Sequence, residues 1–272
     1  MKNLITEQDR ATFMTCYEKL INLNIEALLP ENTAKAPDSC PNLISKITSR
    51  DTVERFFKLA MLLTDYNSHT NLTAITDVEG VILRHFIDSL VAEPYIPEGV
   101  RMIDVGTGAG FPSLPLAIVR DDINITALDS TAKKLDFVSG AAASLGLSGV
   151  SVLAGRAEEL SAVDASPLRE TYDVAIARAV APLNILSELC LPFVKVGGIF
   201  IALKGSGAQK ELAEARNAIS RLGGRLENAF QTDIFATING YFENRCICII
   251  RKVSPTPAKL PRAFAAIKSS PL

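Results

Sequence analysis

Three closely spaced glycines after a short apolar run form the most distinctive chemical pattern in the chain. Gly106, Gly108 and Gly110 alternate with Thr107 and Ala109 in the order Gly-x-Gly-x-Gly. Glycine at these positions lets the backbone turn sharply and approach a ligand closely. Open α/β sheets bind nucleotides in such loops, at the carboxyl ends of their strands. A nucleotide site is therefore predicted here, with a purely structural turn as the alternative.

The glycine spacing distinguishes two nucleotide classes. The dinucleotide fingerprint, Gly-x-Gly-x-x-Gly, places a pyrophosphate at a helix N-terminus. Here the third glycine comes one residue earlier and is followed by Phe111 and Pro112. Asp104, two residues before the first glycine, would repel a pyrophosphate but can pair with the cationic end of a methionine. The spacing favours S-adenosylmethionine, with Asp104, Gly106 and Gly108 as candidate ligands.

Acidic residues follow the next two predicted strands. Asp129 ends the run at residues 124–129, where a carboxylate can accept hydrogen bonds from both ribose hydroxyls. The alternative is that Asp129 belongs to the N-cap region of the following helix. After the third strand, Ala157 leaves room for a flat adenine ring and Glu158 can accept from its exocyclic amine. A solvent-exposed pair of glutamates at a helix start is the alternative there.

Two cations follow the fourth and fifth predicted strands. Arg178 comes after five mostly apolar residues, and Lys204 ends residues 199–204. The carboxyl ends of the strands form the edge of the sheet at which ligands bind, called here its active edge. An arginine there can pair with a phosphate or a base edge, so Arg178 is the candidate for positioning a substrate. Two cations at one edge suit an anionic substrate such as RNA.

Several chemistries lack their usual residues. No Asp/Asn-Pro-Pro-Tyr motif follows the fourth strand, although methylation of an exocyclic amine usually requires one. No Pro-Cys motif is present there either, so a cysteine nucleophile for attack on a pyrimidine carbon is missing. Of the two histidines, we interpret His85 as a structural residue with a local hydrogen bond. Five cysteines without a Cys-x-x-Cys are expected to be reduced thiols, mostly buried, and no metal site is predicted.

These residues need an α/β domain to position them, and the hydrophobic periodicity predicts one from residue 100 onward. Apolar runs alternate with helical patterns, and the last two runs form an antiparallel pair joined by residues 236–243. The fold class is therefore α/β, with a doubly wound, mostly parallel seven-stranded sheet. The strands are expected at residues 100–105, 124–129, 150–155, 172–179, 199–204, 225–235 and 244–252.

The first 95 residues are predicted to be helical. A helix, a loop interrupted by Pro30, Pro37 and Pro41, and a second helix occupy the first 50 residues. Further helices are expected at residues 52–66, with Asp51 as N-cap, and at 78–93. This gives a helical region at 1–95, a nucleotide-binding domain at 96–255 and a basic tail at 256–272.

Composition narrows the class of protein. The 272 residues include 48% hydrophobic and 21% charged residues, as in globular proteins. No apolar run is long enough to span a bilayer and no secretory signal opens the chain, so we expect a cytoplasmic protein without a membrane partner. The net charge is −2, but residues 244–272 carry +6 without any acid. This asymmetry favours an anionic partner at one place, with a solvated tail as the alternative.

The motifs taken together resemble the RsmG family, also called GidB, over about residues 50–272. They are Asn71-Leu72-Thr73-Ala74-Ile75, Arg84-His85-Phe86-Ile87-Asp88-Ser89-Leu90, the run from Ile103 to Pro112, Leu128-Asp129-Ser130, Arg156-Ala157-Glu158, Ala177-Arg178-Ala179, Leu203-Lys204-Gly205, Pro261-Arg262 and Lys268-Ser269-Ser270-Pro271-Leu272.

The resemblance implies a Rossmann-like class I methyltransferase that modifies N7 of one guanine in 16S ribosomal RNA, with that RNA or the small ribosomal subunit as partner. It places S-adenosylmethionine against Gly106, Phe111, Ala157, Glu158 and Arg178. The chain departs from the family pattern in having Tyr66-Asn67 for Trp-Asn, Ser113 for Gly, and about 50 N-terminal residues without a recognisable motif.

Methylation at guanine N7 agrees with the absence of an evident general base, because N7 carries a lone pair and no proton. Two alternatives remain open from the residues. A nicotinamide-dependent dehydrogenase is disfavoured by the glycine spacing. A ribosome-assembly factor that binds the methyl donor without turnover would carry the same motifs.

Overall fold

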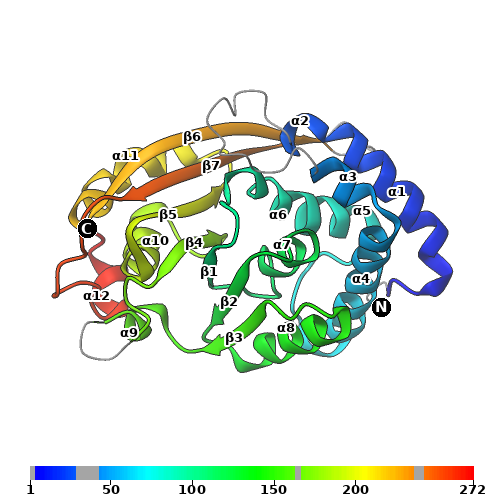
Figure 1. Ribbon diagram of the computed structural model, residues 1–272, viewed down its shortest axis with the longest axis horizontal. Coiled ribbons are helices and arrows are strands. Elements are labelled where there is room, and N and C mark those ends of the chain that lie inside the picture. Colours follow the sequence, from blue (N-terminus) through cyan, green and yellow to red (C-terminus); the bar gives the residue numbers. More distant parts are fainter. Residues whose placement is uncertain (1–3, 29–42, 163–166, 236–241) are drawn as a thin grey trace.

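One sheet of seven strands forms the centre of the fold (Figure 1). The computed structural model describes residues 4–28, 43–162, 167–235 and 242–272. The strand order is β3-β2-β1-β4-β5-β7-β6. The strands are β1 Arg101–Val105, β2 Asn124–Asp129, β3 Val150–Ala154, β4 Tyr172–Arg178, β5 Val194–Lys204, β6 Gly224–Phe235 and β7 Phe242–Lys252.

The strand directions confirm the predicted fold class. β1 to β5 pair in parallel, and β7 lies antiparallel to both β5 and β6. The predicted antiparallel pair is thus present, although most of its predicted connection, residues 236–241, lies outside the described residues. The strand order reverses between β1 and β4, which is the point where open α/β sheets bind ligands.

Alternate residues of each central strand enter hydrophobic cores on opposite faces of the sheet. In β4, Val174 and Ile176 belong to one core, whereas Ala175 and Ala177 belong to the other. The first core includes α7 Ser113–Val119, α8 Ala132–Leu145 and the N-terminal helices. The second core includes residues of α9 Ala157–Leu160, α10 Leu183–Cys190, α11 Ala208–Arg221 and α12 Phe264–Ser269. Burial on both faces explains the nearly continuous apolar strand sequences.

The N-terminal helices are α1 Arg10–Leu23, α2 Ile25–Leu28, α3 Leu43–Thr48 and α4 Arg50–Thr70. The predicted N-cap of α4 was wrong: Ser49, not Asp51, accepts a hydrogen bond from the Thr52 amide at 3.3 Å. The prolines of the expected loop lie outside the described residues. The helix expected at 78–93 consists of α5 Val78–Gly80, a π-helical segment Val81–Ile87, α6 Asp88–Leu90 and a final 3-10 turn. The helices of residues 10–95 share the first core with the sheet and pack beside its active edge; they are called here the helical wall.

Four of the five cysteines are described, and all four are free thiols. Cys246 and Cys248 lie on one face of β7 with their sulfur atoms 3.7 Å apart, and both are buried. Cys40 lies outside the described residues. Within the described ranges, no three or more His, Cys, Asp and Glu side chains gather as a metal site, and no helix has the length and apolar character to cross a membrane.

The C-terminal segment packs against the domain. Leu260 and Ile267 are 2% and 0% exposed, and both belong to the second hydrophobic core. Four of the six cations in residues 244–272 form ion pairs, so most of the positive charge of this segment is compensated within the described part of the fold. The pairs are Arg245–Asp88, Arg251–Glu227, Lys252–Glu170 and Arg262–Glu188.

Candidate active site

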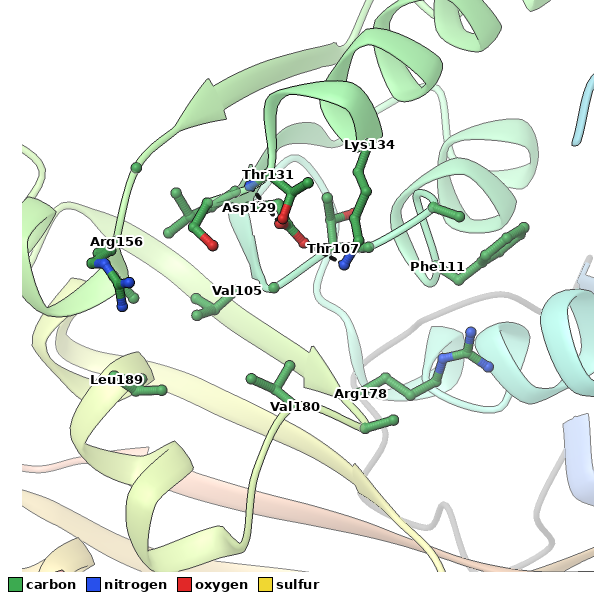
Figure 2. A pocket seen from close by; sticks show the side chains of 18 of the residues that line it. Val105, Thr107, Phe111, Asp129, Thr131, Lys134, Arg156, Arg178, Val180 and Leu189 are labelled. Atoms are coloured by element: carbon green, nitrogen blue, oxygen red, sulfur yellow. Dashed lines mark hydrogen bonds and ion pairs between the residues drawn. The ribbon is translucent and has the colours of Figure 1, made fainter. Parts of the chain in front are cut away.

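A cavity of about 480 Å³ opens at the carboxyl ends of β1 to β4 (Figure 2). Its volume falls within the range of roughly 300–1,000 Å³ that is usual for cofactor and small-molecule sites. The lining includes seven of the eight residues expected from the sequence to bind the donor. They are Gly106, Gly108, Phe111, Asp129, Ala157, Glu158 and Arg178.

The glycine loop lines the cavity from Gly106 to Ala109. Gly106, Gly108 and Gly110 have φ angles of +77°, +60° and +81°, a region that glycine enters without steric cost. A Cβ atom on Gly106 would stand 2.7 Å from the Val180 side chain. The loop is held from the neighbouring strand, because the amides of Gly106 and Thr107 both donate to the Leu128 carbonyl. Both the turn and the close approach therefore require glycine.

Asp129 holds the glycine loop as well as lining the cavity. Its Oδ2 accepts from the Gly108 amide at 3.0 Å, and its Oδ1 accepts from the Thr131 amide at 2.8 Å. Lys134 places its Nζ 3.8 Å from Oδ2. The carboxylate thus holds the backbone just before α8, as one interpretation requires, and it also lines the cavity, where its ribose-binding role stays a prediction.

Asp104 is the exception among the candidate ligands, because it does not line the cavity. It is fully buried, and Ser113 Oγ donates to its Oδ2 at 2.6 Å. Burial raises the pKa of Asp104 to about 6, although the Ser113 hydrogen bond acts in the opposite direction. Ser113, one departure from the family pattern, therefore supplies the partner of a buried carboxyl behind the glycine loop.

The loop between β3 and α9 borders one end of the cavity. Ala157 and Glu158 are 9% and 7% exposed, and both line it. Arg156 Nη1 lies 3.8 Å from Glu158 Oε1. Figure 2 shows Arg156 and Leu189 at one end of the cavity, and Phe111 and Arg178 at the other.

Arg178 is anchored by the helical wall. Its Nη1 donates to the Arg84 carbonyl at 2.6 Å and to Asp88 Oδ2 at 2.7 Å. Its guanidinium lies 5.7 Å from the centroid of the Phe111 ring. Asp88 thus fixes one nitrogen atom of the guanidinium, and the predicted role of Arg178 in positioning a substrate stays a prediction. Arg178 nevertheless lines the cavity.

The π-helical segment contributes His85, whose ring stacks on Phe111 with centroids 4.3 Å apart and planes at 7°. His85 Nε2 lies 3.0 Å from Thr73 Oγ1, so the local hydrogen bond expected for this histidine is present. Burial, with a further contribution from the Arg178 charge, lowers the pKa of His85 to about 3. The histidine is therefore neutral near pH 7 while it forms part of the cavity wall.

The prediction that Lys204 supplies a second cation for the substrate was wrong, because Lys204 is paired and does not line the cavity. Its Nζ donates to the Ala181 carbonyl at 2.8 Å and pairs with Glu211 at 2.7 Å. The side chain is 7% exposed and does not line the cavity. Its partner Glu211 belongs to α11, and this contact could not be read from the local sequence.

Several residues that line the cavity were not predicted from the sequence as part of the site. Thr73 has a local signal, because it belongs to the 71–75 motif and Asn67 binds both its amide and its carbonyl, each at 2.9 Å. Val180 follows Ala179, a non-glycine residue with a φ of +55°. Phe264 has no local signal, because it reaches the cavity only through the folding of the C-terminal segment.

Comparisons with known proteins agree with this site. The family model described as GidB, rRNA small subunit methyltransferase G, matches residues 52–233. Ribosomal RNA small subunit methyltransferase G of Limosilactobacillus reuteri (strain DSM 20016) is 44% identical over 218 residues, which cover 79% of this chain and 88% of that protein. The same-named protein of Staphylococcus carnosus (strain TM300) is 44% identical over 238 residues, covering 85% of this chain and 97% of that protein.

A solved structure shares the fold. The (4+2)-cyclase SpnF superposes with a TM-score of 0.51 at 18% identity, covering 75% of this chain and 96% of that one. The sequence relatives are far closer, and they identify the methyltransferase class that the motifs predicted. The chain therefore belongs to the rRNA small subunit methyltransferase G (GidB) family.

Proposed function

We propose that this enzyme methylates N7 of a specific guanine in 16S ribosomal RNA, with S-adenosylmethionine as donor. The observation that carries the proposal is the cavity at the strand-order reversal, whose glycine loop and Asp129 suit a nucleoside ligand. The sequence relatives support the class of substrate, since they are named for the RNA of the small subunit. That RNA is met in the cytoplasm, the location expected from the sequence.

The cavity fits the donor in shape and chemistry. Gly106 and Gly108 line the cavity without side chains, so a ligand can approach their backbone closely. Each oxygen of Asp129 accepts one backbone hydrogen bond and retains capacity for a ribose hydroxyl. Ala157 and Glu158 border the proposed adenine position, and Phe111 and Arg178 border the opposite end. When bound, S-adenosylmethionine supplies an electrophilic methyl group.

The protein's task in this reaction is orientation. Guanine N7 has no proton to remove, so the neutral His85 is not needed as a base. Correct alignment of two reactants can contribute about 7–11 kcal/mol to lowering a barrier. Arg178 suits this task because Asp88 fixes its Nη1. Its hydrogen bonds to the described residues are made through Nη1, which leaves Nε and Nη2 available for a phosphate or a base edge.

The test is to map N7-methylguanine in ribosomal RNA from cells with and without this protein. Purified enzyme is then supplied with labelled donor and with either naked 16S RNA or assembled small subunits. We expect one guanine to lose its methyl group in the deletion strain and to regain it in vitro. Donor binding without transfer to either substrate would instead identify an assembly factor.

A further inference from the structure

Phe264, at the start of α12, is an exposed aromatic residue that faces the active-site cavity. It is 37% exposed, although most large apolar side chains of the described residues are buried. It lines the cavity together with residues more than 100 positions earlier in the chain. A large apolar surface left open in a cavity is suited to contact with a ligand.

The segment that carries Phe264 is held firmly. The Arg262 side chain donates to both carboxylate oxygens of Glu188, at 2.9 Å from Nε and 2.7 Å from Nη2. Glu188 is 0% exposed and adjoins Leu189, which lines the cavity. Arg169 adds hydrogen bonds to the Leu260 and Thr256 carbonyls. These anchors lie on both sides of Leu260 and fix the position from which Phe264 projects.

The neighbours of Phe264 belong to the end of the cavity at the β3–α9 loop. The Arg156 guanidinium lies over its ring, 5.7 Å from the centroid, and Arg156 also approaches Glu158. Figure 2 places Arg156 at the end away from Phe111 and Arg178. Through its contact with Arg156, Phe264 is therefore assigned to the end of the cavity that holds the proposed adenine position.

We propose that Phe264 binds the adenine portion of the methyl donor, so that the C-terminal segment is part of the donor site. This inference rests on the proposed function. An aromatic ring can contact the flat face or edge of a base, and the contact buries apolar area that is exposed in the free protein. The neighbouring Arg156 adds a cation beside the same ring.

The test measures dissociation constants by calorimetry for S-adenosylmethionine and for 5′-methylthioadenosine, which lacks the amino-acid portion. The proteins are the full-length chain, Phe264→Ala, Phe264→Leu and the control Lys268→Ala, which changes an exposed residue of the same helix. We expect Phe264→Ala to weaken both ligands about 10-fold, the order of one base–aromatic contact. Phe264→Leu, which keeps apolar packing, should weaken both less, and Lys268→Ala should not change either.

Three results would overturn the inference. Affinities of Phe264→Ala within twofold of the wild type would remove Phe264 from the donor site. Weaker binding of S-adenosylmethionine alone would place it at the amino-acid end. A lower melting temperature of ligand-free Phe264→Ala, with Phe264→Leu binding normally, would assign it a packing role. Absence of donor binding by the wild-type protein would refute the proposed function itself, which separates the two failures.

Discussion

Gly106 combines a left-handed backbone conformation with the absence of room for a side chain. We predict that Gly106→Val abolishes donor binding, because a Cβ would stand 2.7 Å from Val180 and φ is +77°. Calorimetry against S-adenosylmethionine checks this, with Gly140→Ala as control because a Cβ at Gly140 meets nothing within 4 Å. Wild-type affinity in a folded Gly106→Val variant would contradict the prediction.

Asp104 makes stability depend on pH. Its pKa rises from 3.8 to about 6 on folding, so the folded protein binds the proton more tightly than the unfolded chain. The stabilisation is present in full below about pH 4 and is lost as pH rises through 6. Two pKa units correspond to about 3 kcal/mol in the free energy of unfolding.

We predict that Asp104→Asn, which cannot ionise, gains stability relative to the wild type between pH 4 and pH 7.5. Urea denaturation at the two pH values measures the difference. His85 has the opposite dependence, since its lowered pKa of about 3 removes stability as pH falls below 6.5. Because both proteins contain His85, its effect cancels in the comparison. A difference that stays constant with pH would show that Asp104 does not titrate in this range.

Individual positions in the cavity lining were predictable where the sequence carries a backbone requirement. The spacing of the three glycines predicts their loop. Asp129 ends the neighbouring parallel strand, which must stop at the same edge of the sheet. Lys204 was misplaced because its position on the strand does not reveal Glu211, a helical partner seven residues later. Phe264 was missed because no spacing relates it to Arg156, more than 100 residues away.

At the scale of elements, α6 is tied to the ends of two strands through one carboxylate. Asp88 is 7% exposed at its side chain and pairs with Arg178 of β4 at 2.7 Å and with Arg245 of β7 at 2.5 Å. Removing one partner of a largely buried ion pair leaves the other charge uncompensated.

We predict that Asp88→Ala lowers the free energy of unfolding by about 3 kcal/mol, the lower end of the range for breaking buried pairs. Chemical denaturation measures this. The control is Asp51→Ala, which removes the exposed Asp51–Arg55 pair and should cost less than about 1 kcal/mol. Equal effects of the two substitutions would mean that the helix is not held to the strands by this carboxylate.

The alternation of strands and helices was predictable because strands buried on both faces are continuously apolar. The residue at which β5 begins could not be predicted in this way. The sequence predicts a strand from residue 199, whereas β5 begins at Val194. The partner of β4 moves from Val194 to Ile199 while β4 advances only from Tyr172 to Val174. The strand includes Gly197 and Gly198, which lie in this irregular part of the pairing.

For the whole molecule, folding pairs most of the cations of the basic segment with distant acidic residues. The acidic body supplies Glu170, Glu188 and Glu227 to the cations of the basic segment. Sequence counts cannot reveal this, because the partners are distant in the chain. In particular, Arg262 donates hydrogen bonds to Glu188, which is fully buried. A substitution of Arg262 therefore changes the stability of the fold, and its effect on RNA binding cannot be interpreted separately.

The remaining exposed cations of the C-terminal segment provide the last prediction. Lys259 and Lys268 are exposed, and neither forms an ion pair within the part of the chain that the structure describes. If they contact RNA phosphates, Lys259→Ala/Lys268→Ala should flatten the slope of log RNA affinity against log salt by about two, near one per lost contact. Its melting temperature and donor affinity should match the wild type.

Arg262→Ala is the matched comparison for this double variant, because it removes one cation from the same segment. It should lower the free energy of unfolding by about 3 kcal/mol, since it leaves Glu188 buried without its partner. Salt titrations and thermal melts of both proteins separate the roles of the segment. An unchanged salt slope in the stable double variant would move the RNA contact away from the C-terminal segment, whose charge would then serve folding through Glu188 and its other partners.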